Sequence, residues 1–142
     1  MELEGRIWKD KKFWLVEVPS LGIMTQGKTR KEALEMIQNA ILETVHAYFE
    51  QLPRGFSVTI TDYKHEAIGV RASDHKVLLS LSLIRQREES GSTIREAAKR
   101  LGSKSPNSYA QYEQGSTMMS VEKYAQLLQA ANPVRHSLLR IL

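Results

Sequence analysis

The pattern of apolar residues changes near residue 73, and this change limits the chain to few architectures. Before residue 73, short runs that alternate as in strands surround one stretch with helical spacing. Beyond residue 73, the segments have helical spacing and are separated by glycines or turn-prone residues. The sequence of 142 residues therefore predicts two small domains, residues 1–72 and residues 73–142.

The first half has the pattern of a small α+β domain. The run from Thr29 to Gln51 repeats apolar residues at three- and four-residue spacing behind a capping-box pair, Thr29 and Glu32. Alternating runs predict strands at residues 2–8, 12–18, 21–27 and 56–63. The polar joint "KDKK" makes the first two strands an antiparallel hairpin. The order is β-β-β-α-β, and a last short strand at "AIGVRA" is left open.

The second half is predicted to be all helical. Its predicted helices span residues 74–90, 93–101, 106–114 and 120–131. The second of these begins with another capping-box pair, Thr93 and Glu96, and ends where Gly102 supplies the required conformational freedom. The stretch "STIREAAKRLGSKSPNSYAQYEQG" therefore predicts two helices joined by a turn.

The second helix of this pair is predicted to expose polar, uncharged side chains. Ser105 can cap it, Pro106 suits its first position, and Tyr109 and Tyr112 face inward. The outward residues share amide or hydroxyl groups: Asn107, Ser108, Gln111 and Gln114. Amides can form paired hydrogen bonds with adenine, and hydroxyls can reach phosphates. On the residues alone, a solvated helix hairpin without a ligand remains the alternative.

The charge distribution favours a polyanionic partner for the second half. Residues 1–73 hold 10 Lys and Arg against 10 Asp and Glu, whereas residues 74–142 hold 10 against 6. Cationic side chains bind DNA by displacing counterions from its phosphates. We predict that Asn107 and Gln111 read bases and that Lys104 and Ser108 contact phosphates. The remaining residues predicted to bind DNA are Thr93, Ser105 and Gln114.

Several classes of site are excluded by composition. The chain has no cysteine, and its four histidines lie too far apart for local metal-ligand spacing. We therefore expect no metal and no cofactor. The start "MELEG" lacks a basic leader, and the longest apolar run, "VLLSLSLI", is too short to cross a bilayer. We expect a cytoplasmic protein with no membrane partner.

Residues 83–131 resemble the helix-turn-helix domain of the phage-repressor (Xre/Cro) class. The resemblance rests on the helix order, the alanine pair before "KRLG" and the aromatic-Glu-x-Gly end of the recognition helix. It implies binding to double-stranded operator DNA. It also implies a structural ion pair between Arg87 on the first helix and Glu113.

Residues 13–41, "FWLVEVPSLGIMTQGKTRKEALEMIQNAI", resemble the signature of HicB antitoxins. The resemblance implies a reduced RNase H-like N-terminal domain that binds a HicA-like RNA-cleaving toxin, and a C-terminal domain that represses its own operon. The first hairpin and the "MTQGKT" segment would face the toxin, with Trp8, Phe13, Trp14, Met24 and Gln26 as contacts. Strand alternation sends Phe13 and Trp14 to opposite faces, so one of them should be exposed or covered by a partner.

Two other functions stay open at this point. The chain could be a stand-alone helix-turn-helix repressor whose N-terminal domain oligomerises or binds another partner. It could also be a nuclease, which needs converging carboxylates to hold metal ions. The available acids are Glu2, Glu4, Asp10, Glu17 and Asp62. Their spacing predicts no cluster, so we expect that the chain is not an enzyme.

DNA binding by this class predicts an oligomer. One recognition helix reads too few base pairs to select an operator, so we expect a homodimer or a higher even oligomer. The apolar run "VLLSLSLI" and the tail "HSLLRIL" could supply the contact surface in the C-terminal half. The alternative is that both segments complete the core of a small domain.

Overall fold

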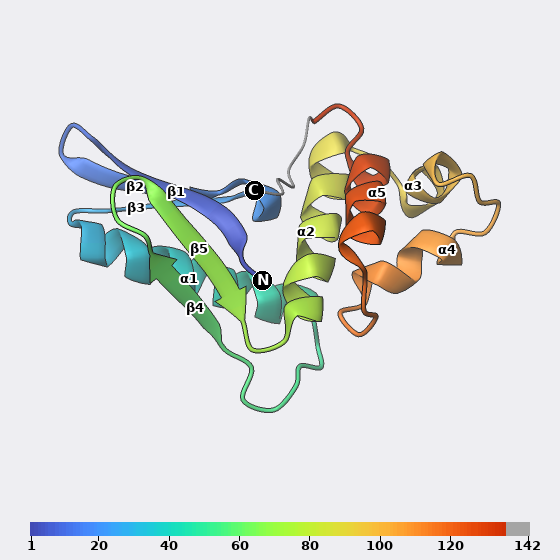
Figure 1. The fold of residues 1–142 in the computed structure, drawn as a ribbon, viewed down its shortest axis with the longest axis horizontal. Coiled ribbons are helices and arrows are strands. Elements are labelled where there is room, and N and C mark those ends of the chain that lie inside the picture. The colour runs from blue at the N-terminus through green and yellow to red at the C-terminus, as the bar shows by residue number, and fades with distance from the viewer. Residues whose placement is uncertain (136–142) are drawn as a thin grey trace. The chain divides into compact units, whose positions relative to one another are not determined.

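The computed structural model describes residues 1–135 and divides into two compact units (Figure 1). The first unit comprises residues 1–75 and the second begins at Lys76, close to the predicted boundary at residue 72. The tail "HSLLRIL", which was considered as a contact surface, lies outside the described residues. Each unit is described by itself.

The first unit is an antiparallel sheet of five strands with one long helix. The sheet order is β3-β2-β1-β5-β4, and every neighbouring pair is antiparallel. The elements are β1 (Leu3–Asp10), β2 (Phe13–Val18), the short 3-10 helix η1 (Pro19–Leu21), β3 (Ile23–Gly27), α1 (Arg30–Tyr48), β4 (Val58–Asp62) and β5 (Ala67–Ala72).

The predicted order β-β-β-α-β is incomplete, because β5 follows β4 and lies between β4 and β1. The tight turn before β5 passes through Lys64 and His65, whose φ angles are 67° and 53°. Non-glycine residues seldom adopt this left-handed conformation, so no residue at this position predicts a hairpin. Ile68 and Val70 are buried, as expected for a strand with neighbours on both sides.

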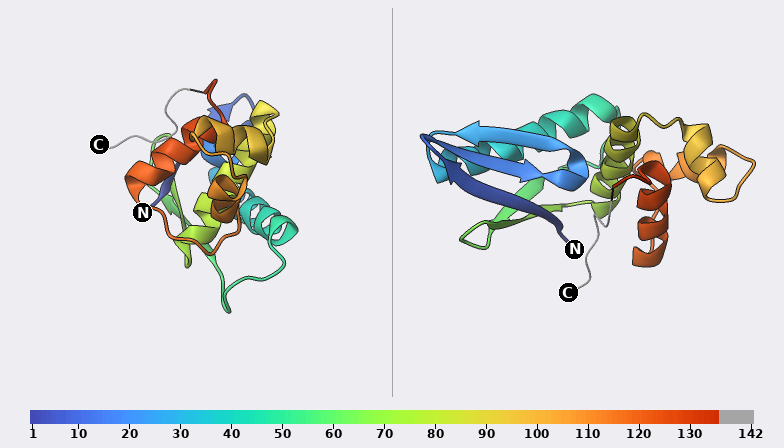
Figure 2. Two further views of the ribbon diagram at one scale, coloured as in Figure 1. Left: turned by 90° about the vertical axis from the view of Figure 1, so that its right-hand side faces the viewer. Right: turned by 90° about the horizontal axis from the view of Figure 1, so that it is seen from above.

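Helix α1 lies along one face of the sheet and completes its core (Figures 1 and 2). The Thr29 hydroxyl accepts a hydrogen bond from the Glu32 amide at 3.0 Å, which is the Thr29 half of the predicted capping box. The helix buries Ala33, Ile37, Ile41 and Val45, at the spacing that defines one helical face. Gly27 permits the close approach, since a Cβ atom there would lie 2.5 Å from the Ala33 amide nitrogen.

Two side chains of α1 tie it to the edge strand β4. The Arg30 guanidinium donates two hydrogen bonds to the Asp62 carboxylate, at 2.7 and 3.1 Å, and lies 5.5 Å from the ring centre of Trp14. Further along the helix, Gln38 donates to the Val58 carbonyl at 2.6 Å. Through Arg30 the helix therefore contacts strands on either side of β1, because Trp14 belongs to β2 and Asp62 to β4.

The second unit is all helical. Its elements are α2 (His75–Ser90), α3 (Ile94–Arg100), α4 (Asn107–Ala110), the 3-10 helix η2 (Gln111–Glu113) and α5 (Val121–Ala131). Helices α2 and α5 lie side by side (Figures 1 and 2). The core consists of apolar and tyrosine side chains, namely Leu79, Leu83, Ala97, Ala98, Tyr109, Tyr124, Leu127, Leu128 and Ala131.

The run "VLLSLSLI" forms the first part of α2, and all eight of its residues are buried. Leu79 and Leu83 belong to the core of the second unit. Whether the rest of the run also serves as a contact surface for a second copy stays a prediction. Among residues 1–135, no helix has the length and apolar character that a membrane crossing requires.

The Arg30–Asp62 pair predicts a dependence of stability on acid. The two hydrogen bonds from Arg30 hold the pKa of Asp62 below its usual value. A lowered pKa in the folded state stabilises the fold above the pKa of the unfolded chain, and this stabilisation is lost as the pH falls below about 4. Because Asp62 is 35% exposed, we expect Asp62→Asn to cost at most about 1 kcal/mol at neutral pH.

Urea unfolding at pH 7 and pH 3, followed by tryptophan fluorescence, measures this effect because both tryptophans belong to the first unit. The parent should lose its advantage over Asp62→Asn at pH 3. Glu35→Gln, which removes an exposed carboxylate from the same helix as Arg30, is the control. An equal difference between parent and Asp62→Asn at both pH values would contradict the assignment.

Candidate nucleic-acid interface and outer sheet face

Helix α3 is closed at both ends by the residues that the sequence suggested. The Thr93 hydroxyl accepts from the Glu96 amide at 3.1 Å, and the Glu96 carboxylate accepts from the Thr93 amide at 3.2 Å. The Thr93 amide and the Thr93 hydroxyl both donate to the Glu96 carboxylate, and these two bonds lower the pKa of Glu96. The chain leaves the helix through Gly102, whose φ angle is 81°.

The recognition segment, residues 107–113, differs from the predicted single helix over residues 106–114. It consists of one α-helical turn, α4, followed directly by η2. No side chain caps its start, so the predicted cap by Ser105 is wrong. Instead, the Ser105 carbonyl accepts from the amide and the hydroxyl of Ser108, at 3.2 and 2.8 Å. Ser105 therefore takes part at the start of the segment through its backbone carbonyl and not through its side chain.

Two tyrosines fix the inner side of the recognition segment. Tyr109 is fully buried and donates to the Leu83 carbonyl at 3.4 Å. Its burial raises its pKa, so the hydroxyl keeps its proton. Tyr112 is partly buried against the same core, and the Lys123 ammonium lies 5.5 Å from the centre of its ring.

Arg87 and Glu113, the two residues of the expected ion pair, are joined by two hydrogen bonds. Arg87 Nε donates to one Glu113 oxygen at 2.7 Å, and Nη2 donates to the other at 2.9 Å. A third donor of Arg87 reaches the Ser92 carbonyl at 3.1 Å. The two side chains are 18% and 8% exposed, so water screens the pair only weakly. The Glu113 carboxylate raises the pKa of Arg87, mainly through its hydrogen bonds.

The residues predicted to bind DNA differ in how free their side chains are. Five are exposed, namely Thr93, Lys104, Ser105, Asn107 and Gln114, whereas Ser108 and Gln111 are half-buried. The amide residues recur at helical spacing, since Gln111 follows Asn107 by four positions and Gln114 follows Gln111 by three. This spacing places side chains on one side of a helix. By contrast, the hydroxyls of Thr93 and Ser108 are already engaged in hydrogen bonds with Glu96 and Ser105. Amides therefore dominate the exposed side of the segment.

Sequence reasoning missed two hydroxyls at the end of the recognition segment. Ser80 of α2 donates to the Tyr112 carbonyl at 2.7 Å and accepts from the Gly115 amide at 2.9 Å. Thr117 donates to the Gln111 carbonyl at 3.3 Å. The available signal was the presence of serines inside the apolar run "VLLSLSLI", since a buried hydroxyl needs a partner.

In the first unit, we call the face of the sheet opposite α1 the outer face. Strand pairing places Trp8, Phe13, Met24 and Gln26 on it, because Leu15 pairs with both Trp8 and Gln26, and Glu17 pairs with Met24. Phe13 is 41% exposed and Met24 is 53% exposed. Four of the five residues predicted to meet a toxin therefore share one face.

Trp14 lies on the opposite face, where Arg30 of α1 stacks on its ring. Of the two neighbouring aromatic residues that alternation separates, Phe13 is thus the exposed one, and Trp14 is half-buried. On the outer face, Arg6 lies 4.9 Å from the ring centre of Trp8 and forms an ion pair with Glu66 at 3.3 Å. The outer face therefore combines exposed apolar side chains with charged neighbours.

Within residues 1–135, no group of three or more His, Asp or Glu side chains is arranged to hold a metal ion. Two of the acids considered for a nuclease are engaged elsewhere. Glu2 accepts a hydrogen bond from Tyr63, which lowers the pKa of Glu2, and Asp62 is paired with Arg30. Whether the chain lacks enzymatic activity stays a prediction.

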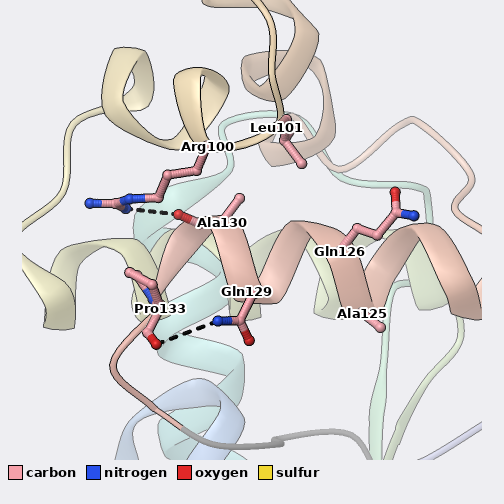
Figure 3. Close-up of a pocket in the computed structure, with 7 residues that line it drawn as sticks. All are labelled: Arg100, Leu101, Ala125, Gln126, Gln129, Ala130 and Pro133. Carbon is pink, nitrogen blue, oxygen red and sulfur yellow. Dashed lines mark hydrogen bonds between the residues drawn. The ribbon is translucent and has the colours of Figure 1, made fainter.

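A pocket of about 730 Å³ lies between α3 and α5 (Figure 3). Arg100 lines it and donates hydrogen bonds to the Ala130 carbonyl and the Ser92 hydroxyl, both at 2.8 Å. The other lining residues are Leu101, Ala125, Gln126, Gln129, Ala130 and Pro133. None of the residues predicted to bind DNA lines this pocket.

Comparison with known proteins gives two matches. A helix-turn-helix family model matches residues 83–139. The UPF0150 protein Ta0767 of Thermoplasma acidophilum is 43% identical to the chain over an alignment of 53 residues, and the match covers 34% of this chain and 77% of that protein. The chain belongs to the UPF0150 family. This UPF0150 member carries a helix-turn-helix domain in its second unit, which makes it a DNA-binding transcription regulator.

The Arg87–Glu113 pair predicts a stability effect confined to the second unit. Glu113→Gln leaves the Arg87 charge partly buried without its counter-charge, so we expect a loss of about 1 to 3 kcal/mol. Thermal unfolding followed by circular dichroism measures the loss, while tryptophan fluorescence reports the first unit. Glu122→Gln, an exposed change on α5, is the control. Equal melting temperatures for Glu113→Gln and the parent would show that the pair is worth little.

Proposed function

We propose that the chain is the antitoxin of a type II toxin–antitoxin pair, which neutralises a HicA-like RNA-cleaving toxin and represses its own operon in the cytoplasm. The observation that carries this proposal is the presence of a UPF0150 relationship and a helix-turn-helix domain in one chain. The UPF0150 relationship is compatible with the resemblance of residues 13–41 to HicB antitoxins. In this proposal the first unit is the reduced RNase H-like domain of that family, and it has no enzymatic activity.

The outer face supports the first unit's proposed role. Exposed aromatic and methionine side chains are frequent anchors in protein interfaces, and Phe13 and Met24 lie exposed beside the half-buried Trp8. Trp14, on the face that packs against α1, contributes to the fold rather than to this surface. We therefore place the toxin on the outer face, with Trp8, Phe13, Met24 and Gln26 as contacts.

The exposed amides support the second unit's proposed role. Asn107 and Gln111 read base edges in the major groove, and Lys104 contacts phosphates. Ser108 contacts a phosphate by exchanging its hydrogen bond to the Ser105 carbonyl for one to the phosphate oxygen. Thr93, Ser105 and Gln114 flank these contacts. A recognition segment of this length covers only a few base pairs, so the chain binds its operator as a homodimer or a higher even oligomer.

Replacement of outer-face residues tests the toxin assignment. We expect Phe13→Ala and Met24→Ala to weaken binding at least about tenfold, because each removes an exposed apolar anchor without opening the core. Calorimetry with a catalytically inactive form of a short basic protein from a neighbouring reading frame, where the genome encodes one, measures the effect. Met36→Ala is the matched control, since Met36 is 45% exposed but belongs to α1.

The outcomes separate the antitoxin from its alternative. If Phe13→Ala and Met24→Ala bind as tightly as the parent, the toxin does not use the outer face. If the neighbouring protein does not bind the parent at all, the chain is better described as a stand-alone repressor whose first unit oligomerises or binds another partner.

The DNA contacts predict two different kinds of loss. Gln111→Ala should cost about 1 to 3 kcal/mol on the operator and little on unrelated DNA, because it removes base contacts. Lys104→Ala should weaken binding to both and reduce the salt dependence by about one charge, because it removes a phosphate contact. Fluorescence anisotropy at several salt concentrations measures both, and light scattering gives the mass of the free protein. A monomer that binds the operator with full affinity would contradict the dimer.

A further inference from the structure

The recognition segment ends at a point where its own backbone cannot satisfy its carbonyl groups. The last carbonyls of any helix lack amide partners within the helix. Here the winding changes from α4 to the tighter η2 at Gln111, and the segment ends two residues later at Glu113. The carbonyls of Gln111 and Tyr112 therefore need donors from elsewhere.

Hydroxyl groups outside the segment supply these donors. The Thr117 hydroxyl donates to the Gln111 carbonyl, and the Ser80 hydroxyl donates to the Tyr112 carbonyl at 2.7 Å. Ser80 also accepts from the Gly115 amide at 2.9 Å, so one oxygen holds the chain on both sides of Glu113. A hydroxyl can donate and accept at once, which alanine cannot do.

Ser80 and Arg87 act on the same short stretch from one helix. They are seven residues apart, so they lie on one side of α2 two turns from each other. Arg87 holds the Glu113 side chain, whereas Ser80 holds the backbone before and after Glu113. The direction of the backbone at Gln111 and Gln114 is thereby fixed from inside the protein.

We infer that Ser80 is a positioning residue for sequence readout: from a fully buried place on α2, it sets the direction in which Gln111 and Gln114 meet the DNA bases. The inference rests on the DNA-binding part of the proposed function. Ser80 is not exposed and so cannot contact DNA itself. Its effect must pass through the backbone of residues 112–115, because base readout requires amides aligned with base edges.

Ser82 provides a matched control for this inference. Both serines are fully buried in α2, but the Ser82 hydroxyl donates to the Leu79 carbonyl and lies 2.6 Å from the Tyr124 hydroxyl on α5, and both partners lie outside the recognition segment. Ser80→Ala and Ser82→Ala remove the same atom from the same helix. Alanine favours the helical conformation, so both variants should fold.

The experiment measures the ratio of affinities for two DNA fragments at a temperature where melting curves show every variant folded. One fragment is the region upstream of this chain's own gene, and the other is a shuffled sequence of equal length. We expect Ser80→Ala to lower the ratio about tenfold, the size of one lost directional hydrogen bond, while affinity for shuffled DNA and its salt dependence stay unchanged. Thr117→Val should lower the ratio in the same direction.

Ser82→Ala should lower the melting temperature and leave the ratio unchanged. An unchanged ratio in Ser80→Ala, or an equal fall in Ser82→Ala, overturns the inference. If the parent does not prefer the upstream fragment, the proposal of self-repression fails. The affinity ratio of Ser80→Ala is then measured on the sequence that the parent selects from a random duplex library. If the parent selects none, the inference about readout fails as well.

Discussion

A recognition segment of one α-helical turn and one 3-10 turn cannot hold its shape alone, and the DNA-binding unit depends on how α2 holds it. Isolated helices of this length are unstable in water because nucleation is costly. Arg87 fixes Glu113 by two hydrogen bonds, Ser80 fixes the adjoining backbone, and Tyr109 fills the core below. The ordered geometry at Gln111 is therefore a tertiary property, and the local sequence supplies only the side chains that use it.

The first unit is under a different constraint: its five-stranded sheet has two faces, and its one helix covers only one of them. Helix α1 buries its apolar side on the inner face and ties itself to β4 through Arg30 and Gln38. The outer face keeps Phe13 and Met24 exposed, which is costly for a sheet that has no partner. The same arrangement that completes the core thus leaves a surface suited to a protein partner.

The sequence predicted the elements with strong periodicity or caps and failed where tertiary contacts decide. The caps at Thr29 and Thr93 form as their spacing indicated, since the bonds involved are local. The sequence leaves the existence of strand β5 open, because the turn before it uses the left-handed conformation at Lys64 and His65 and contains no glycine that would indicate such a turn. The prediction places one helix over residues 106–114 and misses its division at Gln111, because the local pattern carries no sign of the contact between Ser80 and the Tyr112 carbonyl, which joins residues 32 positions apart.

The net positive charge of the second half indicates DNA binding less clearly than its amide side chains do, and the contacts of its arginines explain why. Within the second unit, Arg87 is paired with Glu113, Arg135 with Glu89, and Arg100 donates to the Ala130 carbonyl. These cations stabilise the fold and are less available for phosphates than a net charge suggests. The positive excess therefore overstates the charge that is free to meet phosphates, and in the proposed mode of binding the sequence preference comes largely from Asn107, Gln111 and Gln114. Selectivity then depends on the alignment of neutral groups, which is why a buried hydroxyl can influence it.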